Sequence, residues 1–417
     1  MSMRNIHIKL HEAWRKSCCM VRYTHNWRAC IFLFIIASAI MVSCERRPPL
    51  HLRKEVPTRL TIANLAINLN AYWDYKTIYG FDYDWEAEWV YGWDDEDRAQ
   101  FGELGYATPS RFNFRRYYTG STPFLPHHSV IANTIDGNEY TGYFEFGYWD
   151  VLVWNDIHTL DNVQSLNFDE VTSLDSVTAY TNPSMRSARY QAPRFTHAFF
   201  EPEALFSAYE QGIEINENLD GFVYDSLRNV WVKELYMELY PITYIYLTQL
   251  ILHNNRGKIT LADGEANVSG MARSTNVNIG RGGQDAVTVT YGVRFKPGCT
   301  MYHRDDNKQV ISQEKVDVVG GRLMTFGICN LRANKVKHPS EIIDNVKHFM
   351  DMKVQFNNGV DTTFVFDVTD QVRRRFKGGV ITVEVDMDTI PVPIRGGGSA
   401  FDAVVKDYEE ETHEFDM

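Results

Sequence analysis

Cysteine is scarce in this sequence. Only six cysteines occur among its 417 residues, and beyond residue 44 only Cys299 and Cys329 remain. A disulfide scaffold is therefore excluded as the main source of stability, and the chain must depend on a hydrophobic core. In an oxidising compartment these two thiols either pair as a disulfide or stay as two buried free thiols, and the sequence leaves both open.

The chain also lacks the motifs of the common enzyme classes. It contains no GxSxG, HExxH, GxxxxGKS/T or CxxC motif. Cys299 and His303 stand four residues apart, which alone is a weak metal signal. His127 and His128 are adjacent, so their side chains diverge and a surface position is favoured for both. We therefore expect no enzyme activity, no cofactor and no metal, and no catalytic residue can be named.

Positive charge is in short supply as well. The chain has 42 Lys and Arg against 54 Asp and Glu, a formal net charge of -12. Nucleic-acid binding depends on basic side chains that neutralise phosphates. The composition thus argues against a nucleic-acid partner.

No apolar run is long enough for a comfortable membrane span. The longest, residues 29–42, follows Arg22 and Arg28 and ends in Ser43 and Cys44, whereas a spanning helix needs about 20 apolar residues. The order of charge, apolar run and small residues is that of an export signal. The run resembles a bacterial lipoprotein signal, with Met41 where Leu is usual, and a plain anchor helix is the alternative.

That resemblance implies a lipoprotein whose signal peptide, residues 1–43, is removed and whose Cys44 carries lipid, palmitate included. The implied location is the outer membrane, lipid-anchored and exposed at the cell surface. Residues 44–57 are basic and interrupted by proline, which is typical of a tether. Its Arg and Lys either rest on anionic headgroups or are ordinary linker charge.

An aromatic and acidic stretch, Tyr72 to Asp97, is the most unusual composition in the chain, and from Phe81 onward it has a regular pattern. Its rings and carboxylates alternate, which predicts a strand with Trp85, Trp89 and Trp93 on one face and the acids on the other. A similar alternation predicts a strand over Leu65–Trp73. Three interpretations stay open for the aromatic stretch: a core strand with solvated acids, a glycan or protein contact through the tryptophans, and a carboxylate site for catalysis or Ca²⁺.

The rest of the chain is rich in strand patterns and punctuated by turns. Residues 142–156 and 242–252 are apolar on both faces, which predicts strands buried on both sides. A short helix is predicted over 201–210, because proline and acids stand at its start. Further strands are predicted over residues 287–295, 322–328, 353–356, 363–368 and 380–385, and residues 401–405 could close a sheet before an acidic tail. The pattern is that of an all-β protein, and the length suggests two domains with a boundary between Ile213 and Leu227.

Several motifs together point to a family. They are Cys44-Glu45-Arg46-Arg47-Pro48, Trp73-Asp74, Val151-Leu152-Val153-Trp154-Asn155, Val268-Ser269-Gly270-Met271-Ala272, Thr325-Phe326-Gly327, Phe366-Asp367-Val368-Thr369-Asp370 and Gly396-Gly397-Gly398. In this order they resemble an uncharacterised Bacteroides lipoprotein family related to fimbrial anchor and fimbrillin-like proteins.

The family resemblance implies two tandem antiparallel, transthyretin-like β-sandwich domains, here residues 58–226 and 227–417. It also implies a structural or adhesive role at the cell surface, in which the protein anchors, caps or regulates fimbriae. The partners would be fimbrial subunits or other surface proteins joined by strand addition. A glycan-binding lipoprotein of a nutrient-uptake system is the alternative, for which Trp85, Trp89 and Trp93 are the sequence support.

Overall fold

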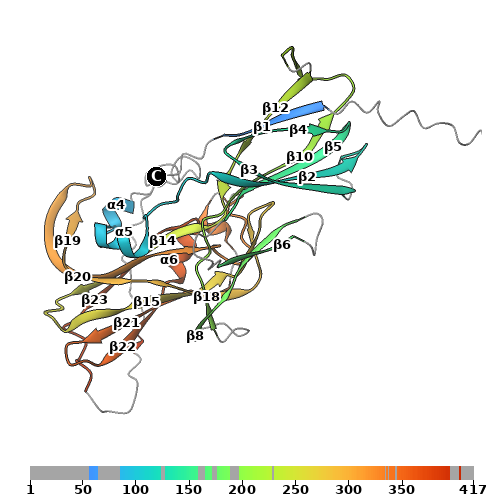
Figure 1. Cartoon of the computed structure of the whole chain (residues 1–417). Coiled ribbons are helices and arrows are strands. Elements are labelled where there is room, and N and C mark those ends of the chain that lie inside the picture. The colour runs from blue at the N-terminus through green and yellow to red at the C-terminus, as the bar shows by residue number, and fades with distance from the viewer. Residues whose placement is uncertain are drawn as a thin grey trace, which may run out of the picture. The chain divides into compact units, whose positions relative to one another are not determined.

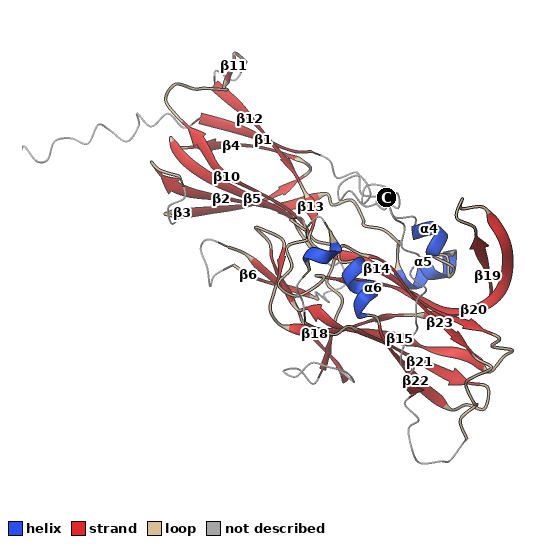
Figure 2. Ribbon diagram, turned by 180° about the vertical axis from the view of Figure 1, so that it is seen from behind, coloured by secondary structure: helices blue, strands red, loops and turns tan. Residues whose placement is uncertain are grey.

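Strands make up most of the molecule, as Figure 2 shows. The structure is a computed structural model and describes residues 56–63, 85–123, 127–157, 165–170, 176–187, 197–227, 230–333, 335–336, 338–342, 345–394 and 403–404. Several predictions lie outside these described residues: the signal peptide, Cys44 and most of the tether, the strand over Leu65–Trp73, the glycine run from Gly396 and the acidic tail.

The strands of the first half begin with β1 (Val56–Ala63). They continue with β2 (Arg111–Gly120), β3 (Ser129–Asp136), β4 (Glu139–Phe144), β5 (Gly147–Asn155), β6 (Leu166–Asp169), β7 (Thr178–Thr181), β8 (Pro183–Ser187), β9 (His197–Phe199), β10 (Phe206–Ile215), β11 (Val223–Asp225), β12 (Val230–Glu238) and β13 (Tyr240–Pro241).

The strands of the second half begin with β14 (Tyr244–His253). They continue with β15 (Ile259–Ala272), β16 (Ser274–Asn276), β17 (Arg281–Gly282), β18 (Ala286–Gly292), β19 (Arg294–Arg304), β20 (Val310–Thr325), β21 (Phe349–Phe356), β22 (Asp361–Asp367), β23 (Gly379–Asp386) and β24 (Ala403–Val404). The described helices are short: α4 (Trp85–Glu88), α5 (Asp95–Phe101), α6 (Thr369–Arg374) and the 3-10 turn η2 (Pro339–Glu341).

Two sheets enclose a first core. Their strand orders are β11-β12-β1-β4 and β13-β10-β5-β2-β3. Phe144 and Met237 from the first sheet meet Phe114, Val153 and Phe206 from the second in one apolar cluster. Since each strand directs alternate side chains to one face, this is the arrangement of a β-sandwich.

A second core lies between two larger sheets, β19-β20-β14-β23 and β24-β22-β21-β15-β18-β9-β8. Tyr246 and Leu323 from the four-stranded sheet pack with Val268, Met352 and Phe364 from the seven-stranded sheet. A small sheet, β17-β16-β7-β6, completes the fold. The all-β, largely antiparallel fold that the sequence predicts is confirmed (Figure 1).

β14 explains why one segment can be apolar on both faces. Tyr246 and Leu250 belong to the second core, whereas Leu247 and Ile251 belong to the first. The four-stranded sheet is therefore covered on both sides, and its central strand β14 has no water-facing side. β5 shows the same pattern, with side chains in the first core and in a third apolar cluster. The strand predicted over 242–252 is present as β14, whereas the one predicted over 142–156 is present only from Gly147, because residues 142–144 belong to β4 of the other sheet.

Two local predictions are wrong. Residues 85–88 form helix α4 instead of a strand. Trp85 and Trp89 are four residues apart, a spacing that fits one helical face as well as alternate positions of a strand, so the sequence pattern was ambiguous. The helix predicted over 201–210 is also absent, because Glu201 and Glu203 accept hydrogen bonds from distant backbone N–H groups and β10 begins at Phe206.

Strand pairing crosses the predicted domain boundary at residue 227. β12 lies after it and pairs with β1, while β9 lies before it and pairs with β18. The division into residues 58–226 and 227–417 stays a prediction, as does the transthyretin-like character of each part.

Candidate functional site

The position of β1 is the first candidate feature. This strand follows the predicted tether directly and lies inside a sheet, between β12 and β4. It pairs with β12 in parallel from Thr58 to Ala63 and with β4 in antiparallel fashion from Val56 to Thr61. Because both edges of β1 are hydrogen-bonded, the first described strand is built into the sandwich rather than laid on its rim.

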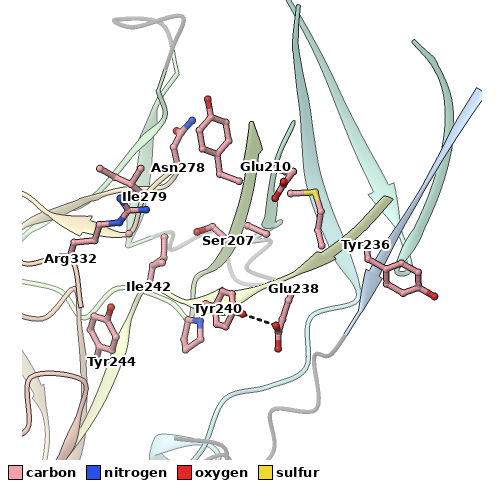
Figure 3. Close-up of a pocket in the computed structure, with 15 residues that line it drawn as sticks. Ser207, Glu210, Tyr236, Glu238, Tyr240, Ile242, Tyr244, Asn278, Ile279 and Arg332 are labelled. Carbon is pink, nitrogen blue, oxygen red and sulfur yellow. Dashed lines mark hydrogen bonds between the residues drawn. The ribbon is translucent and has the colours of Figure 1, made fainter. Parts of the chain in front are cut away.

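A pocket of about 290 Å³ is the second candidate feature (Figure 3). Its walls come from β10, β12 and β13, and from the segment after β16. The side chains that give it chemical character are Ser207, Glu210, Tyr236, Glu238, Tyr240, Asn278 and Arg332. Figure 3 shows Asn278 and Arg332 on the side of the pocket opposite Tyr236 and Glu238.

Charge in this pocket is of both signs. Tyr240 donates a hydrogen bond of 2.6 Å to Glu238 Oε2, and that bond, with burial, raises the pKa of Tyr240 to about 12. Burial lowers the pKa of Arg332 below its usual value. Carboxylates, phenols and a guanidinium around a concave surface can bind a hydroxyl-rich or zwitterionic ligand.

The three tryptophans do not form an exposed row. Trp85 and Trp89 are buried in the first core, with 9% and 8% of their surface exposed. Trp93 is partly buried, stacks near Phe101 and donates from Nε1 to Gly102 O at 3.1 Å. The structure thus packs the three rings against other parts of the chain. A ligand contact through these tryptophans stays a prediction, and Trp85 and Trp89 offer no exposed ring face for it.

A buried carboxylate holds this aromatic segment in place. Asp97 has no exposed surface, accepts a hydrogen bond from Tyr91 OH at 2.7 Å and forms ion pairs with Lys296 and Arg294 of β19. Burial, followed by the bond to Asp97, raises the pKa of Tyr91 well above its usual range. Gln249 of β14 accepts hydrogen bonds from the backbone N–H groups of residues 90 and 91. Together these contacts fasten the segment from Val90 to Asp97 to β14 and β19, and we call them the clip.

Neighbouring ion pairs strengthen the same clip. Asp94 accepts from Arg294 at 2.7 Å and pairs with Lys296 at 2.9 Å. Burial alone would raise the pKa of Asp94, but hydrogen bonds from the backbone of Asp97 and from Lys296 outweigh it and lower the pKa. Asp94 is also the N-cap of α5, so one side chain both starts the helix and fastens it to β19.

The structure gives a position to each of the two cysteines and to His127. Cys299 and Cys329 are both free thiols, one half-buried beside the first core and one buried in a third apolar cluster. The surface position predicted for His127 is wrong: its ring stacks on Tyr117 and hydrogen-bonds Asp150 at 2.9 Å. Asp150 lies on β5, far along the chain, and nothing near His127 in the sequence announces it.

The described part of the chain contains neither a metal-binding group nor a membrane-spanning helix. It holds no group of three or more His, Cys, Asp or Glu side chains arranged to bind a metal ion. Among its helices, none has the length and apolar character needed to cross a membrane.

Solved structures of proteins from Bacteroides and Porphyromonas are similar to this chain at low sequence identity. A solved structure of a candidate adhesin from Bacteroides ovatus is similar over 82% of this chain and 96% of its own, at 13% identity and a TM-score of 0.43. The fimbrial anchor protein Mfa2 from Porphyromonas gingivalis is similar over 68% of this chain and 86% of its own, at 12% identity and a TM-score of 0.33.

A candidate polysaccharide-binding protein from Bacteroides thetaiotaomicron is similar over 80% of this chain and 92% of its own, at 8% identity and a TM-score of 0.35. No family model and no curated protein matches the sequence. The solved structures are of the kind that the sequence motifs resemble.

The residues of both candidate features escaped the sequence analysis. Tyr240 and Arg332 lie almost a hundred positions apart and meet only through the strand arrangement. The parallel pairing of β1 with β12 leaves no local signature either. The apolar residues Phe222, Val223 and Tyr224 were an available signal, but they fall inside the segment predicted to be a domain boundary, Ile213 to Leu227.

Proposed function

We propose that the chain is a cell-surface lipoprotein that acts by docking and not by catalysis. A lipid on Cys44 fastens it to the outer membrane, and its sandwich anchors, caps or regulates a fimbria. The observation that carries this proposal is the placement of β1 between β12 and β4.

The placement of β1 suits a strand that transmits load. A pull on the tether acts along the axis of β1, so the hydrogen bonds to both neighbours are loaded together instead of one after another. Each such bond contributes a net stability of about 0.5–1.5 kcal/mol, and all must yield before β1 leaves the sheet. A chain that holds an assembly at a membrane needs its anchored end joined in this way.

Strand addition is the way in which we expect fimbrial subunits or other surface proteins to join. In that mode an extended segment of one chain adds to an open sheet edge of another. The last described strand of this chain gives an example within one molecule, since β24 pairs in parallel with β22 through Ala403 and Val404 and becomes the edge of the seven-stranded sheet. This pairing supports the proposal that an edge of the seven-stranded sheet can accept an added strand.

The lipid anchor is tested by the substitution Cys44→Ala in the native cells. We expect it to abolish labelling by fatty acid and to release the protein from membranes. The matched control is Cys30→Ala, which lies in the predicted signal peptide and should leave the mature protein labelled. Labelling that persists in the Cys44→Ala variant refutes the anchor.

The fimbrial role is tested separately by deleting the gene. If the chain anchors or caps fimbriae, cells without it should shed fimbriae into the medium or carry fimbriae of altered length. Cells that express the Cys44→Ala variant should show the same defect. Unchanged fimbriae on both strains would remove the fimbrial role and leave the anchor standing.

Glycan binding is the second candidate, and the pocket of Figure 3 now favours it in place of the tryptophans. Tyr236 is 71% exposed and offers a ring face to a sugar, while Glu238 offers an acceptor for hydroxyl groups. Calorimetry with surface glycans should detect binding that Tyr236→Ala weakens and that Tyr302→Ala, an exposed tyrosine of β19, leaves unchanged. Equal affinities would rule the pocket out.

A further inference from the structure

A hairpin in the first sandwich exposes several large apolar side chains. β11 and β12 pair so that Tyr224 lies opposite Trp231, and their ring centroids are 5.3 Å apart. We call Val223, Tyr224, Leu227 and Trp231 the hairpin tip. Their exposed fractions are 71%, 46%, 97% and 41%. A gathering of bulky apolar side chains in water marks an interaction surface rather than a scattered exposure.

The one acidic group in the turn is directed at the chain itself. Asp225 Oδ1 accepts a hydrogen bond from the backbone N–H of Leu227 at 2.9 Å. This bond satisfies part of the carboxylate and fixes the backbone of Leu227. The tip therefore presents the exposed side chain of Leu227 together with the paired rings of Tyr224 and Trp231.

The hairpin tip lies at the end of the sheet where the chain enters. β1 runs parallel to β12 with Thr58 opposite Lys233. Val56 precedes Thr58 on β1, as Trp231 precedes Lys233 on β12, so the two parallel strands begin at the same end of the sheet. The turn of the hairpin precedes β12, so it projects beyond this same end, as Figure 2 shows for β11 and β12.

The chain length before β1 limits how far this end can be from a lipid on Cys44. Twelve residue steps separate Cys44 from Val56, and fully extended they span at most about 40 Å. Once the lipid is inserted, the hairpin tip is held at a high local concentration of membrane surface, so even weak insertion is populated. Trp and Tyr are the side chains that favour the membrane interface, with aliphatic groups buried beneath them.

We propose that the hairpin tip docks on the phospholipid bilayer that holds the lipid anchor, with Leu227 and Trp231 inserted into the interface. This inference rests on the lipid anchor of the proposed function and adds a second contact with the membrane. The contact would fix the orientation of the sandwich on the membrane, which a flexible tether alone does not do.

The test uses the full lipidated protein reconstituted in vesicles of phosphatidylethanolamine and phosphatidylglycerol that carry a doxyl quencher near the headgroup. An environment-sensitive fluorophore is attached to Leu227→Cys in a chain with Cys299→Ser and Cys329→Ala. The matched control carries the fluorophore at Tyr236→Cys. Tyr236 is 71% exposed on the same strand, about 17 Å further from the hairpin turn than Trp231.

We expect the probe at position 227, and not the probe at 236, to shift its emission to shorter wavelength and to be quenched by the doxyl lipid. Adding Trp231→Ser should reduce both effects at 227. A protein that floats with the vesicles but shows equal, water-like emission at both positions overturns the docking and leaves the anchor intact. A protein that does not float refutes the lipid anchor and this inference with it.

Discussion

Glu201 is partly buried, and its carboxyl group lies against β20. Its Oε2 accepts a hydrogen bond of 2.7 Å from the backbone N–H of Met324. Burial raises its pKa to about 7, although the charge of Arg322 and the bond from Met324 act in the opposite direction. An acid raised in this way is protonated in the folded state at pH values where the unfolded chain is already ionised.

The raised pKa of Glu201 determines how the stability of the protein changes with pH. The contribution of Glu201 to stability is complete below about pH 4.5 and is lost as the pH rises through about 7. The loss amounts to roughly 2–3 kcal/mol at most. We expect Glu201→Gln, which keeps an acceptor for Met324 but never ionises, to unfold at higher urea concentration than the parent at pH 8 and at a similar concentration at pH 4.5.

Glu203→Gln is the control for that experiment. Its Oε1 accepts from the backbone N–H of Ser165 at 2.9 Å, so it has the same chemistry two residues away. A gain for Glu201→Gln that does not change between the two pH values would contradict the assignment.

Among the elements, the segment from α4 to α5 is rich in acidic residues, yet its rings pack into the first core. Glycines make room for its rings: a Cβ at Gly320 would meet Tyr91 Cδ2 at 2.5 Å, and one at Gly292 would meet Phe101 Cε1 at 2.3 Å. Asp97 also forms ion pairs with Lys296 and Arg294, which hold the segment against β19. Loss of that charge would leave these two partly buried cations with only the more exposed Asp94 as a shared anionic partner.

We therefore expect Asp97→Asn to destabilise the protein by about 3–5 kcal/mol, the cost of breaking a buried ion pair. Asp95→Asn is the matched control. Asp95 is 96% exposed and forms an ion pair with Arg98 of the same helix. Its replacement should therefore cost less than about 1 kcal/mol. Urea unfolding measures both values. Equal costs would show that the clip is not the source of stability.

The sequence predicts the two-faced strands well and this segment poorly, for physical reasons. β5 and β14 carry runs of apolar residues that no solvent-facing strand can accommodate. In α4 the spacing of Trp85 and Trp89 suits two periodicities at once. The burial of Asp97 depends on Lys296 and Arg294, which come from the far half of the chain, and no local pattern announces such partners.

For the whole molecule, the cores share strands in a way that the sequence order hides. The first core takes Leu247 and Ile251 from β14 in addition to residues of the first sandwich. β8 and β9 belong to the seven-stranded sheet although they precede residue 227. Residues from 56 onward accordingly form one unit by their contacts.

This organisation predicts how fragments behave. A fragment of residues 227–417 lacks β8, β9 and the segment that covers one face of β14, so its apolar surface is left in water. We expect it to aggregate or to melt without a cooperative transition, while the chain from residue 45 melts cooperatively. Circular dichroism and calorimetry decide between these outcomes. A sharp melt of the fragment would establish residue 227 as the boundary of an independent domain.

Under the proposed export and lipidation, the parallel pairing of β1 with β12 sets an order of events. Thr58 would emerge from the secretion channel long before its partner Lys233, and pairings between such distant residues form slowly. If Cys44 is acylated as we propose, the N-terminal end is fastened to lipid before β1 pairs with β12. The slow closing of the sheet then leaves time for acylation.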